Sequence, residues 1–320
     1  KWFHVPQIIR ENGIGILAVQ ETHLTDELAE QFHTLFDSRL VLHHSPDPET
    51  RNAKGIALIL NKRMVKTDQA TTTVIVPGRA ITLTLPWQEN ERINILAVYS
   101  PNAQAEIREF WKTINAKLET NPTLKPDIVL GDFNLVEDAI DRIPCRGDDA
   151  QTVQTLREFK IKHNLTDGWR KANPTEKAYS WTRLSDGTQS RIDRIYVKEE
   201  MFPDCSDWAI AMPPIPTDHD MILAKVTTPT TPKLGRGRWA IPTRTLKNKK
   251  IKSEIQTLGL SLQRKIELSQ QTRLNYKPQQ LLKDFKTEVR EIIRTYEKKT
   301  QPMIKKRIEN LSKKLQEILN

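Results

Sequence analysis

The sequence has few cysteines, few glycines and no long apolar run. Two cysteines, Cys145 and Cys205, cannot build a disulfide framework, which favours a reducing compartment. Eleven glycines in 320 residues exclude collagen-like chains and Gly/Ser linkers. Apolar runs such as Ile14–Val19 are far shorter than the roughly 18–20 residues of a membrane-spanning helix. The remaining class is a charged globular chain, long enough for about two domains.

The net charge of +10 is divided unevenly along the chain. Residues 233–320 contain 23 Lys and Arg against 8 Asp and Glu, a balance of +15, whereas residues 1–232 carry −5. This asymmetry predicts an anionic partner for the basic segment, with nucleic acid first and a membrane surface second. A solvated, charged helix is the alternative interpretation.

Residues 1–232 alternate between short β-rich runs and a few helical segments. The expected strands are Ile14–Val19, Arg39–Leu42, Gly55–Leu60, Thr73–Val76, Ala80–Leu85, Ile93–Tyr99, Asp127–Gly131, Arg191–Val197 and Met221–Val226. Apolar residues recur with helical spacing over 2–9, 107–118 and 153–161. The pattern predicts an α/β protein with two packed sheets covered by helices.

The rest of the chain has a different pattern. A Pro-, Gly- and Arg-rich segment, 229–246, is expected to be a linker, which gives three parts: 1–228, 229–246 and a basic helical segment over 247–320. After Pro302, apolar residues follow a 4-3-4-3 spacing typical of a heptad seam. A short coiled coil and packing onto a neighbouring domain explain this seam equally well.

The clearest functional motif follows the strand 127–131. Asp132 and Asn134 come two residues apart at its end, so in extended geometry both side chains project to one side. A carboxylate and an amide placed in this way can orient a water and bind a phosphate oxygen. An Asx turn that merely closes the strand is the alternative.

Two other strands also end in polar residues. Glu21 follows the first strand and could be a carboxylate ligand of Mg²⁺ or a solvated loop residue. Tyr99 ends the strand 93–99 and could offer its hydroxyl to a phosphate or pack at the rim of the core. Near the end of this part, Asp193 could hold the imidazole of His219 through one nitrogen and leave the other for substrate. A capped turn is the alternative for Asp218-His219.

Five motifs follow one another in a fixed order. They are Gln20-Glu21-Thr22-His23, Val98-Tyr99-Ser100-Pro101-Asn102, Gly131-Asp132-Phe133-Asn134, Ser190-Arg191-Ile192-Asp193 and Thr217-Asp218-His219. In these motifs the sequence resembles the endonuclease/exonuclease/phosphatase superfamily, which has the DNase I-like fold, over about residues 2–228. Within it, the sequence is most similar to the apurinic-type endonuclease domain of non-LTR (LINE-type) retrotransposons, those of fungi in particular. The resemblance implies a four-layer α/β sandwich.

The resemblance also implies a metal-dependent DNA endonuclease. Glu21 and Asp218 would bind Mg²⁺, with Mn²⁺ as the alternative ion. Asp132 would position or deprotonate the attacking water, and Asn134 would orient that water and the phosphate. Tyr99 would contact the scissile phosphate, while Asp193 would orient His219 to stabilise the developing charge. Four arginines would bind nucleic acid: Arg191, Arg194, Arg236 and Arg238.

The implied setting is a retrotransposon that uses the nick to prime reverse transcription. Its partners would be DNA, a reverse-transcriptase domain in the full-length element, and element RNA on the basic segment, in the nucleus. In the family, a first strand that carries a catalytic Asn precedes the opening helix, whereas Lys1 already lies at that helix. We therefore expect this sequence to be a piece of a longer element that lacks the first strand, with weak or no activity.

Two alternatives keep other functions open. The chain could be a non-catalytic remnant that binds nucleic acid through its basic segment. It could also keep the fold and hydrolyse a phosphoinositide or sphingomyelin. Arg191, Arg194 and the retrotransposon-like linker argue against a lipid substrate.

Overall fold

The computed structural model describes residues 2–49, 54–87, 91–183, 185–227, 241–272 and 277–319. The chain divides into two compact units, Lys1–Thr231 and Pro232–Asn320, here called the body and the helical unit. Residues 228–240, which hold most of the expected linker together with Arg236 and Arg238, lie outside the described residues. Within the described ranges, no helix is long and apolar enough to span a bilayer.

The body contains two main sheets. The larger has the strand order β4-β5-β6-β7-β12-β9, and a three-stranded sheet has the order β1-β3-β2. These strands are β1 (Ile16–Gln20), β2 (Leu40–Ser45), β3 (Ile56–Asn61), β4 (Thr71–Val76), β5 (Ala80–Pro86), β6 (Arg92–Tyr99), β7 (Ile128–Asp132), β9 (Leu165–Asp167) and β12 (Asp193–Lys198). The remaining strands are β8 (Arg142–Ile143), β10 (Trp181–Thr182), β11 (Gln189–Ser190), β13 (Cys205–Ala211) and β14 (Met221–Val226). The first three of these form a small sheet, and β13 pairs with β14.

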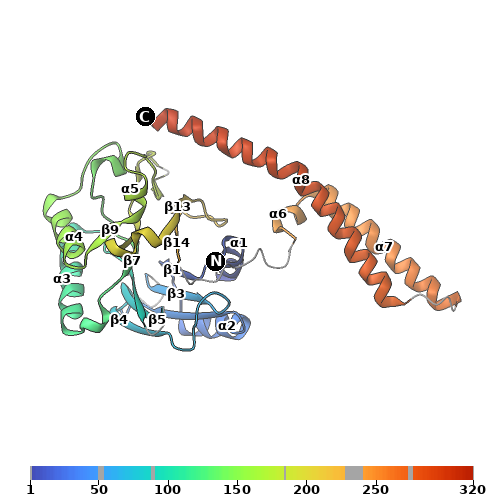
Figure 1. Cartoon of the computed structure of the whole chain (residues 1–320), viewed down its shortest axis with the longest axis horizontal. Helices are drawn as coiled ribbons and strands as arrows, with labels where there is room; N and C mark the ends of the chain where they lie inside the picture. The colour runs from blue at the N-terminus through green and yellow to red at the C-terminus, as the bar shows by residue number, and fades with distance from the viewer. Residues whose placement is uncertain are drawn as a thin grey trace. The chain divides into compact units, whose positions relative to one another are not determined.

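Helices cover the outer faces of both sheets (Figure 1). They are α1 (Val5–Asn12), α2 (Asp26–Phe36), α3 (Gln104–Thr120), α4 (Ala150–Lys162) and α5 (Gly168–Ala172), with 3₁₀ turns at Trp2–His4, Pro122–Leu124, Ala139–Asp141 and Glu199–Asp204. Helices α1 and α2 pack on the three-stranded sheet, and α3 and α4 pack on the six-stranded sheet. The body is therefore a four-layer sandwich, as predicted.

Strand β3 shows why the sheets stack. Its residues alternate between two faces, because side chains along a strand point to opposite sides. Leu58 packs between the two sheets, whereas Ile59 packs under α1 and α2. Both side chains are fully buried. A continuous apolar run with this alternation is what a strand covered on both faces requires.

The helical unit consists of α6 (Thr243–Leu246), α7 (Lys249–Thr272) and α8 (Pro278–Leu319). Helices α7 and α8 pack side by side around Ile251, Val289 and Ile293, which are buried. Asn248 caps α7 by accepting hydrogen bonds from the backbone N–H groups of residues 250 and 251. Helix α8 continues through Pro302, and beyond position 300 every described side chain is exposed.

Candidate active site

The register of three neighbouring strands brings three predicted site residues together. In the parallel pair β6–β7, Tyr99 lies opposite Asp132. In the antiparallel pair β7–β12, Asp132 lies opposite Asp193. Strands β6 and β7 end here and β12 begins here. The three side chains therefore come from one edge of the six-stranded sheet, meaning the side formed by the ends of these strands. Only the pairing of strands far apart in sequence creates this row.

Glu21 reaches the same edge from the other sheet, directly after β1. The hydroxyl of Tyr99 donates a hydrogen bond of 2.7 Å to the Glu21 carboxylate. Burial and the bond to Glu21 raise the pKa of Tyr99, which keeps the hydroxyl protonated as a donor. Glu21 has a left-handed backbone with φ 48°, an uncommon conformation for a residue with a side chain and one that often occurs at functional sites.

Gly131 allows the neighbouring strand β6, and the Gln20 side chain of the other sheet, to lie close to β7. A Cβ at this position would lie 2.0 Å from the backbone oxygen of Val98 and 3.1 Å from the Gln20 side chain, and its φ is +135°. Only glycine fits both constraints.

Asn134 forms the Asx turn that is the alternative interpretation of this motif. Its backbone N–H donates to the Asp132 carboxylate at 2.9 Å, and its φ of 46° is left-handed. Its side-chain amide donates to the backbone oxygen of Ser100 at 2.8 Å. The turn and the functional interpretation are compatible, because the turn is what holds the Asn134 side chain beside the sheet edge.

Asp193 holds His219, as the sequence predicts. The Nδ1 of His219 lies 2.9 Å from Asp193 Oδ2, which leaves Nε2 for a substrate. Ser180 holds Asp193 in turn: its hydroxyl donates to the same Asp193 oxygen at 2.7 Å and accepts the backbone N–H groups of Ile192 and Asp193. The carboxylate is therefore fixed from two sides.

A backbone ladder places His219 beside Asp193. Trp181 and His219 form an isolated antiparallel bridge. The backbone of Asp218 accepts the N–H of Thr182 at 3.1 Å, and the carboxylate of Asp218 accepts the Trp181 indole N–H at 3.0 Å. The segment with the predicted Asp218-His219 motif is therefore attached to the loop that supplies Ser180.

Two carboxylates and an imidazole converge at this point. One ligand atom from each of Asp132, Asp193 and His219 can lie within 4.8 Å of the others, and in the described part of the chain this is the group that could hold a metal ion. Burial and the neighbouring Asp193 raise the pKa of Asp132 to about 8. Burial alone would lower the pKa of His219, but the hydrogen bond and charge of Asp193 raise it to about 9. The site thus holds an excess of buried negative charge.

This donor set fits a hard divalent cation. Carboxylate oxygens are the ligands that Mg²⁺ and Mn²⁺ prefer, and a cation would relieve the repulsion that raises the Asp132 pKa. The predicted ligands Glu21 and Asp218 are not members of the three-residue cluster. Glu21 binds Tyr99 and Asp218 binds Trp181, so their role as metal ligands stays a prediction.

The structure corrects the prediction that Arg191 and Arg194 contact nucleic acid. Their side chains are 2% and 0% exposed, and both form ion pairs with Asp141 and Asp167 inside the body. Burial alone would raise the pKa of Asp141, but hydrogen bonds and charges from Arg191, Arg194 and Arg170 lower it to about 2. These arginines have a structural role, because they neutralise the buried carboxylate of Asp141.

Sequence reasoning missed three residues that support the site: Arg79, Ser180 and Trp181. The Arg79 guanidinium lies 4.6 Å from the centre of the Tyr99 ring and donates to the backbone oxygens of Tyr99 and Ser100. None of the three falls in a motif. Gly78-Arg79 at a turn between alternating runs was an available signal, whereas β10, which begins at Trp181, is two residues long and shows no periodicity.

A family model described as the Endonuclease/Exonuclease/phosphatase family matches residues 3–219, more than half of the chain. The chain belongs to this family. The family and the fold indicate a hydrolase of the nuclease or phosphodiesterase type. The predicted family is therefore confirmed, and the matched range contains every predicted site residue from Glu21 to His219.

A curated relative comes from a transposon. The chain is 29% identical over 237 residues to the "Transposon TX1 uncharacterized 149 kDa protein" of Xenopus laevis. The match covers 73% of this chain and 17% of that protein, so the chain spans about a sixth of the relative's length.

Solved structures share the DNase I-like fold. The AP endonuclease LMAP from Leishmania major has a TM-score of 0.58 at 19% identity, covering 67% of this chain and 78% of that one. The 3′ phosphatase NExo from Neisseria, bound to a product DNA hairpin, has a TM-score of 0.57 at 18% identity, covering 71% and 95%. The endonuclease domain of TRAS1, a telomere-specific non-LTR retrotransposon, has a TM-score of 0.52 at 13% identity, covering 71% and 93%. The predicted fold is thereby confirmed.

Proposed function

We propose that the body hydrolyses phosphodiester bonds with Mg²⁺ or Mn²⁺ and nicks DNA as the endonuclease of a non-LTR retrotransposon. The observation that carries the proposal is that ligand atoms of Asp132, Asp193 and His219 lie within 4.8 Å of one another where the strands end. The TX1 and TRAS1 relatives support the transposon setting, and the DNA hairpin bound to NExo supports a DNA substrate.

The residues divide the work as follows. Asp132, with Asn134 beside it, positions the attacking water, and Asp132 accepts its proton. The imidazolium of His219, held by Asp193, donates to a non-bridging phosphate oxygen as negative charge develops. The hydroxyl of Tyr99 contacts the same phosphate. A bound cation, held by Asp132 and Asp193 with Glu21 and Asp218 as further candidates, would supply Lewis-acid stabilisation of the leaving oxygen.

The test is nicking of supercoiled plasmid by the purified chain, in Mg²⁺ and in EDTA. Asp132→Asn should abolish nicking because it removes a buried carboxylate of the cluster. Asp138→Asn is the matched control: the same chemical change six residues further along, at an exposed side chain. Nicking that survives Asp132→Asn, or persists in EDTA, would reject the proposal and point to a contaminating nuclease.

A second candidate function rests on the helical unit. We propose that this basic segment holds the element's RNA, beside a reverse-transcriptase domain, in the nucleus where the DNA target lies. The supporting observation is the +15 charge of residues 233–320. If the body proves inactive, nucleic-acid binding by this segment is the alternative function of the chain. Binding of RNA by the full chain in EDTA tests this without any cleavage.

A further inference from the structure

Helix α8 gathers about half of its cations on one side. Besides Arg294, which lies in the same arc but already has an interaction within the chain, five cations fall within an arc of about 120° at about 100° per residue. They are Lys283, Lys286, Arg290, Lys298 and Lys305, here called the basic stripe. The acidic residues Asp284, Glu288, Glu291, Glu309 and Glu317 fall on a neighbouring arc. Glu297 alone lies within the stripe, where Arg244 and Thr245 hold its carboxylate.

The stripe faces away from the partner helix. Phe285, Val289 and Tyr296 mark the side of α8 that packs against α7. The stripe is centred about 140° from that side by the same helical geometry, so its cations face solvent. All five side chains of the stripe are exposed.

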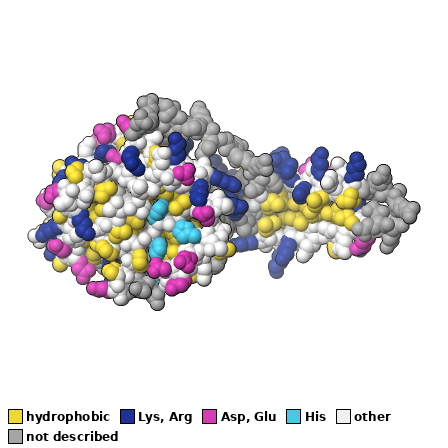
Figure 2. Space-filling model, turned by 90° about the horizontal axis from the view of Figure 1, so that it is seen from below, with side chains coloured by type: hydrophobic (Ala, Val, Ile, Leu, Met, Phe, Trp, Pro, Cys, Tyr) yellow, Lys and Arg dark blue, Asp and Glu magenta, His cyan; other side chains and the backbone are white. Residues whose placement is uncertain are grey.

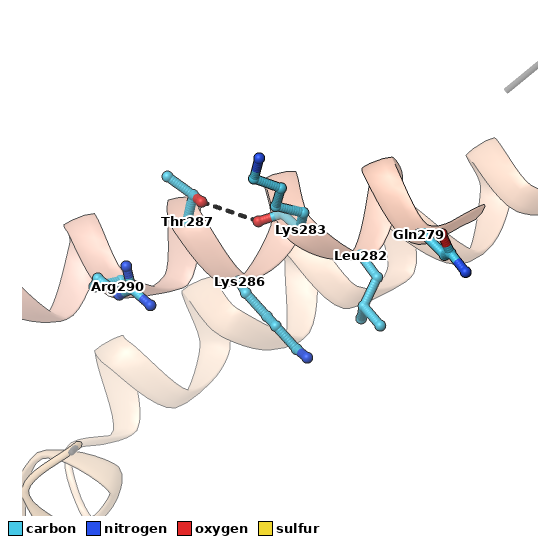
Figure 3. Close-up of a pocket in the computed structure, with 6 residues that line it drawn as sticks. All are labelled: Gln279, Leu282, Lys283, Lys286, Thr287 and Arg290. Carbon is cyan, nitrogen blue, oxygen red and sulfur yellow. Dashed lines mark hydrogen bonds between the residues drawn. The ribbon is translucent and has the colours of Figure 1, made fainter. Parts of the chain in front are cut away.

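The cations of the stripe have no acidic partner among the described residues. The chain's ion pairs in the described ranges involve none of the five. Lys283, Lys286 and Arg290 line a shallow depression on α8 (Figure 3). There Thr287 donates its hydroxyl to the Lys283 backbone oxygen, a bond within α8 that does not involve the ammonium group of Lys283. In the space-filling view, Lys and Arg side chains likewise border the helical unit (Figure 2).

The stripe is long and free of aromatic side chains. It extends over 23 residues, and its ends lie about 33 Å apart at a rise of about 1.5 Å per residue. The backbone of a nucleic-acid duplex curves away from a straight helix of this length, whereas a flexible single strand can follow it. The aromatic residues Phe285 and Tyr296 are half-buried between α7 and α8, so no aromatic side chain on the stripe is available for stacking. The geometry therefore favours contacts to phosphates without recognition of bases.

We propose that the basic stripe of α8 binds the phosphate backbone of single-stranded RNA without sequence preference. The proposal rests on the RNA partner proposed above for the helical unit and names the surface that holds it. It does not require the cleavage site of the body. It assigns the binding to one face of one helix rather than to the net charge of the segment.

The experiment measures binding of the full chain to a fluorescent oligouridine of about 20 nucleotides in EDTA, by fluorescence anisotropy. If all five cations engage phosphates, log K should fall with log salt with a slope of about −3.5. The triple variant Lys283→Gln/Lys286→Gln/Arg290→Gln should bind at least about tenfold more weakly at low salt and reduce the slope to about −1.4.

The chain offers a matched control on the opposite side of α8. Lys299→Gln/Lys306→Gln/Lys313→Gln removes the same charge from the same helix, at exposed positions about 120° to 160° around from Lys283. Its affinity should stay within about threefold of the unchanged chain. Circular dichroism of both variants checks that helix content is equal.

Several outcomes would overturn the assignment of RNA binding to the basic stripe. Equal weakening by both triple variants would leave only a net-charge effect, while the RNA partner itself would survive. No RNA binding at all would reject both proposals. Tighter, stripe-dependent binding to a duplex DNA of the same length, or to phosphatidylserine vesicles, would assign the surface to that ligand instead. Plasmid nicking is measured separately, so failure here does not touch the endonuclease proposal.

Discussion

The body and the helical unit use their cations in opposite ways. In the body, Arg142, Lys160 and Lys198 form ion pairs with carboxylates, and Arg191 and Arg194 are fully enclosed. In the helical unit, the cations of α8 are exposed, and about half of them are gathered on one side. The body has nearly as many Lys and Arg residues as Asp and Glu, yet a large share of these cations is occupied by the fold.

The count of charges does not tell which cations are free for a ligand, whereas their pairing does. A cation that neutralises a buried carboxylate contributes to folding and is lost to a ligand. A cation with no partner costs little to expose and keeps its charge for a polyanion. Four experiments test whether the two regions differ in this way. They are given in order from the largest expected effect to the smallest.

The largest effect is expected in the body, on cleavage. His219→Ala removes the group that faces the developing charge, and it should lower the nicking rate about 10²- to 10⁴-fold. The triple stripe variant of α8 should leave nicking of a saturating plasmid within about threefold. Equal losses in both variants would show that the two regions act as one site.

Asp141→Asn should be the most destabilising single charge change. It leaves Arg191 and Arg194 without their main buried partner, and breaking such a network costs about 3–5 kcal/mol. Glu288→Gln on the exposed face of α8 is the control, with no resolvable change. Urea unfolding followed by circular dichroism measures both. A small effect of Asp141→Asn would mean that water or Asp167 compensates for the lost charge.

The two units should also lose structure separately. Ile293 is fully buried in the small α7–α8 core, and Ile293→Ala should destabilise this pair of helices by about 2–3 kcal/mol. Hydrogen exchange followed by mass spectrometry should become faster in α7 and α8 and stay unchanged in β6 and β7. Faster exchange in the strands as well would show that the units unfold cooperatively.

The smallest effect is a pH dependence that belongs to the body alone. The pKa of His219 is raised to about 9, and that of Asp132 is also raised, so the folded body binds more protons than the unfolded chain between pH 6.5 and 9. In EDTA the melting temperature of the body should therefore fall as pH rises through this window. Mg²⁺ should offset the fall most at high pH, because it competes with these protons. His219→Gln should flatten the curve, and a melting temperature that rises with pH would contradict the assignment.

The sequence predicted the parts of this protein that follow strand ends. Tyr99 and Asp132 were found because each ends a clear apolar run, and Asp193 because it lies between basic residues in the expected strand Arg191–Val197. The pairing of these strands places the three residues in one row. Arg191 and Arg194 were misassigned because charge can be counted in a sequence but burial against Asp141 cannot. Strands β8, β10 and β11 were missed because two residues carry no periodicity, and Ser180 was missed with them.

Gly131 has a consequence for how this site can vary among related chains. Any side chain at this position would meet the backbone oxygen of Val98 in the neighbouring strand β6, so the contact between β6 and β7 at the end that carries Tyr99 and Asp132 is set by main chain rather than by side-chain packing. Substitutions in the core can then vary while the register that places Tyr99 opposite Asp132 stays the same.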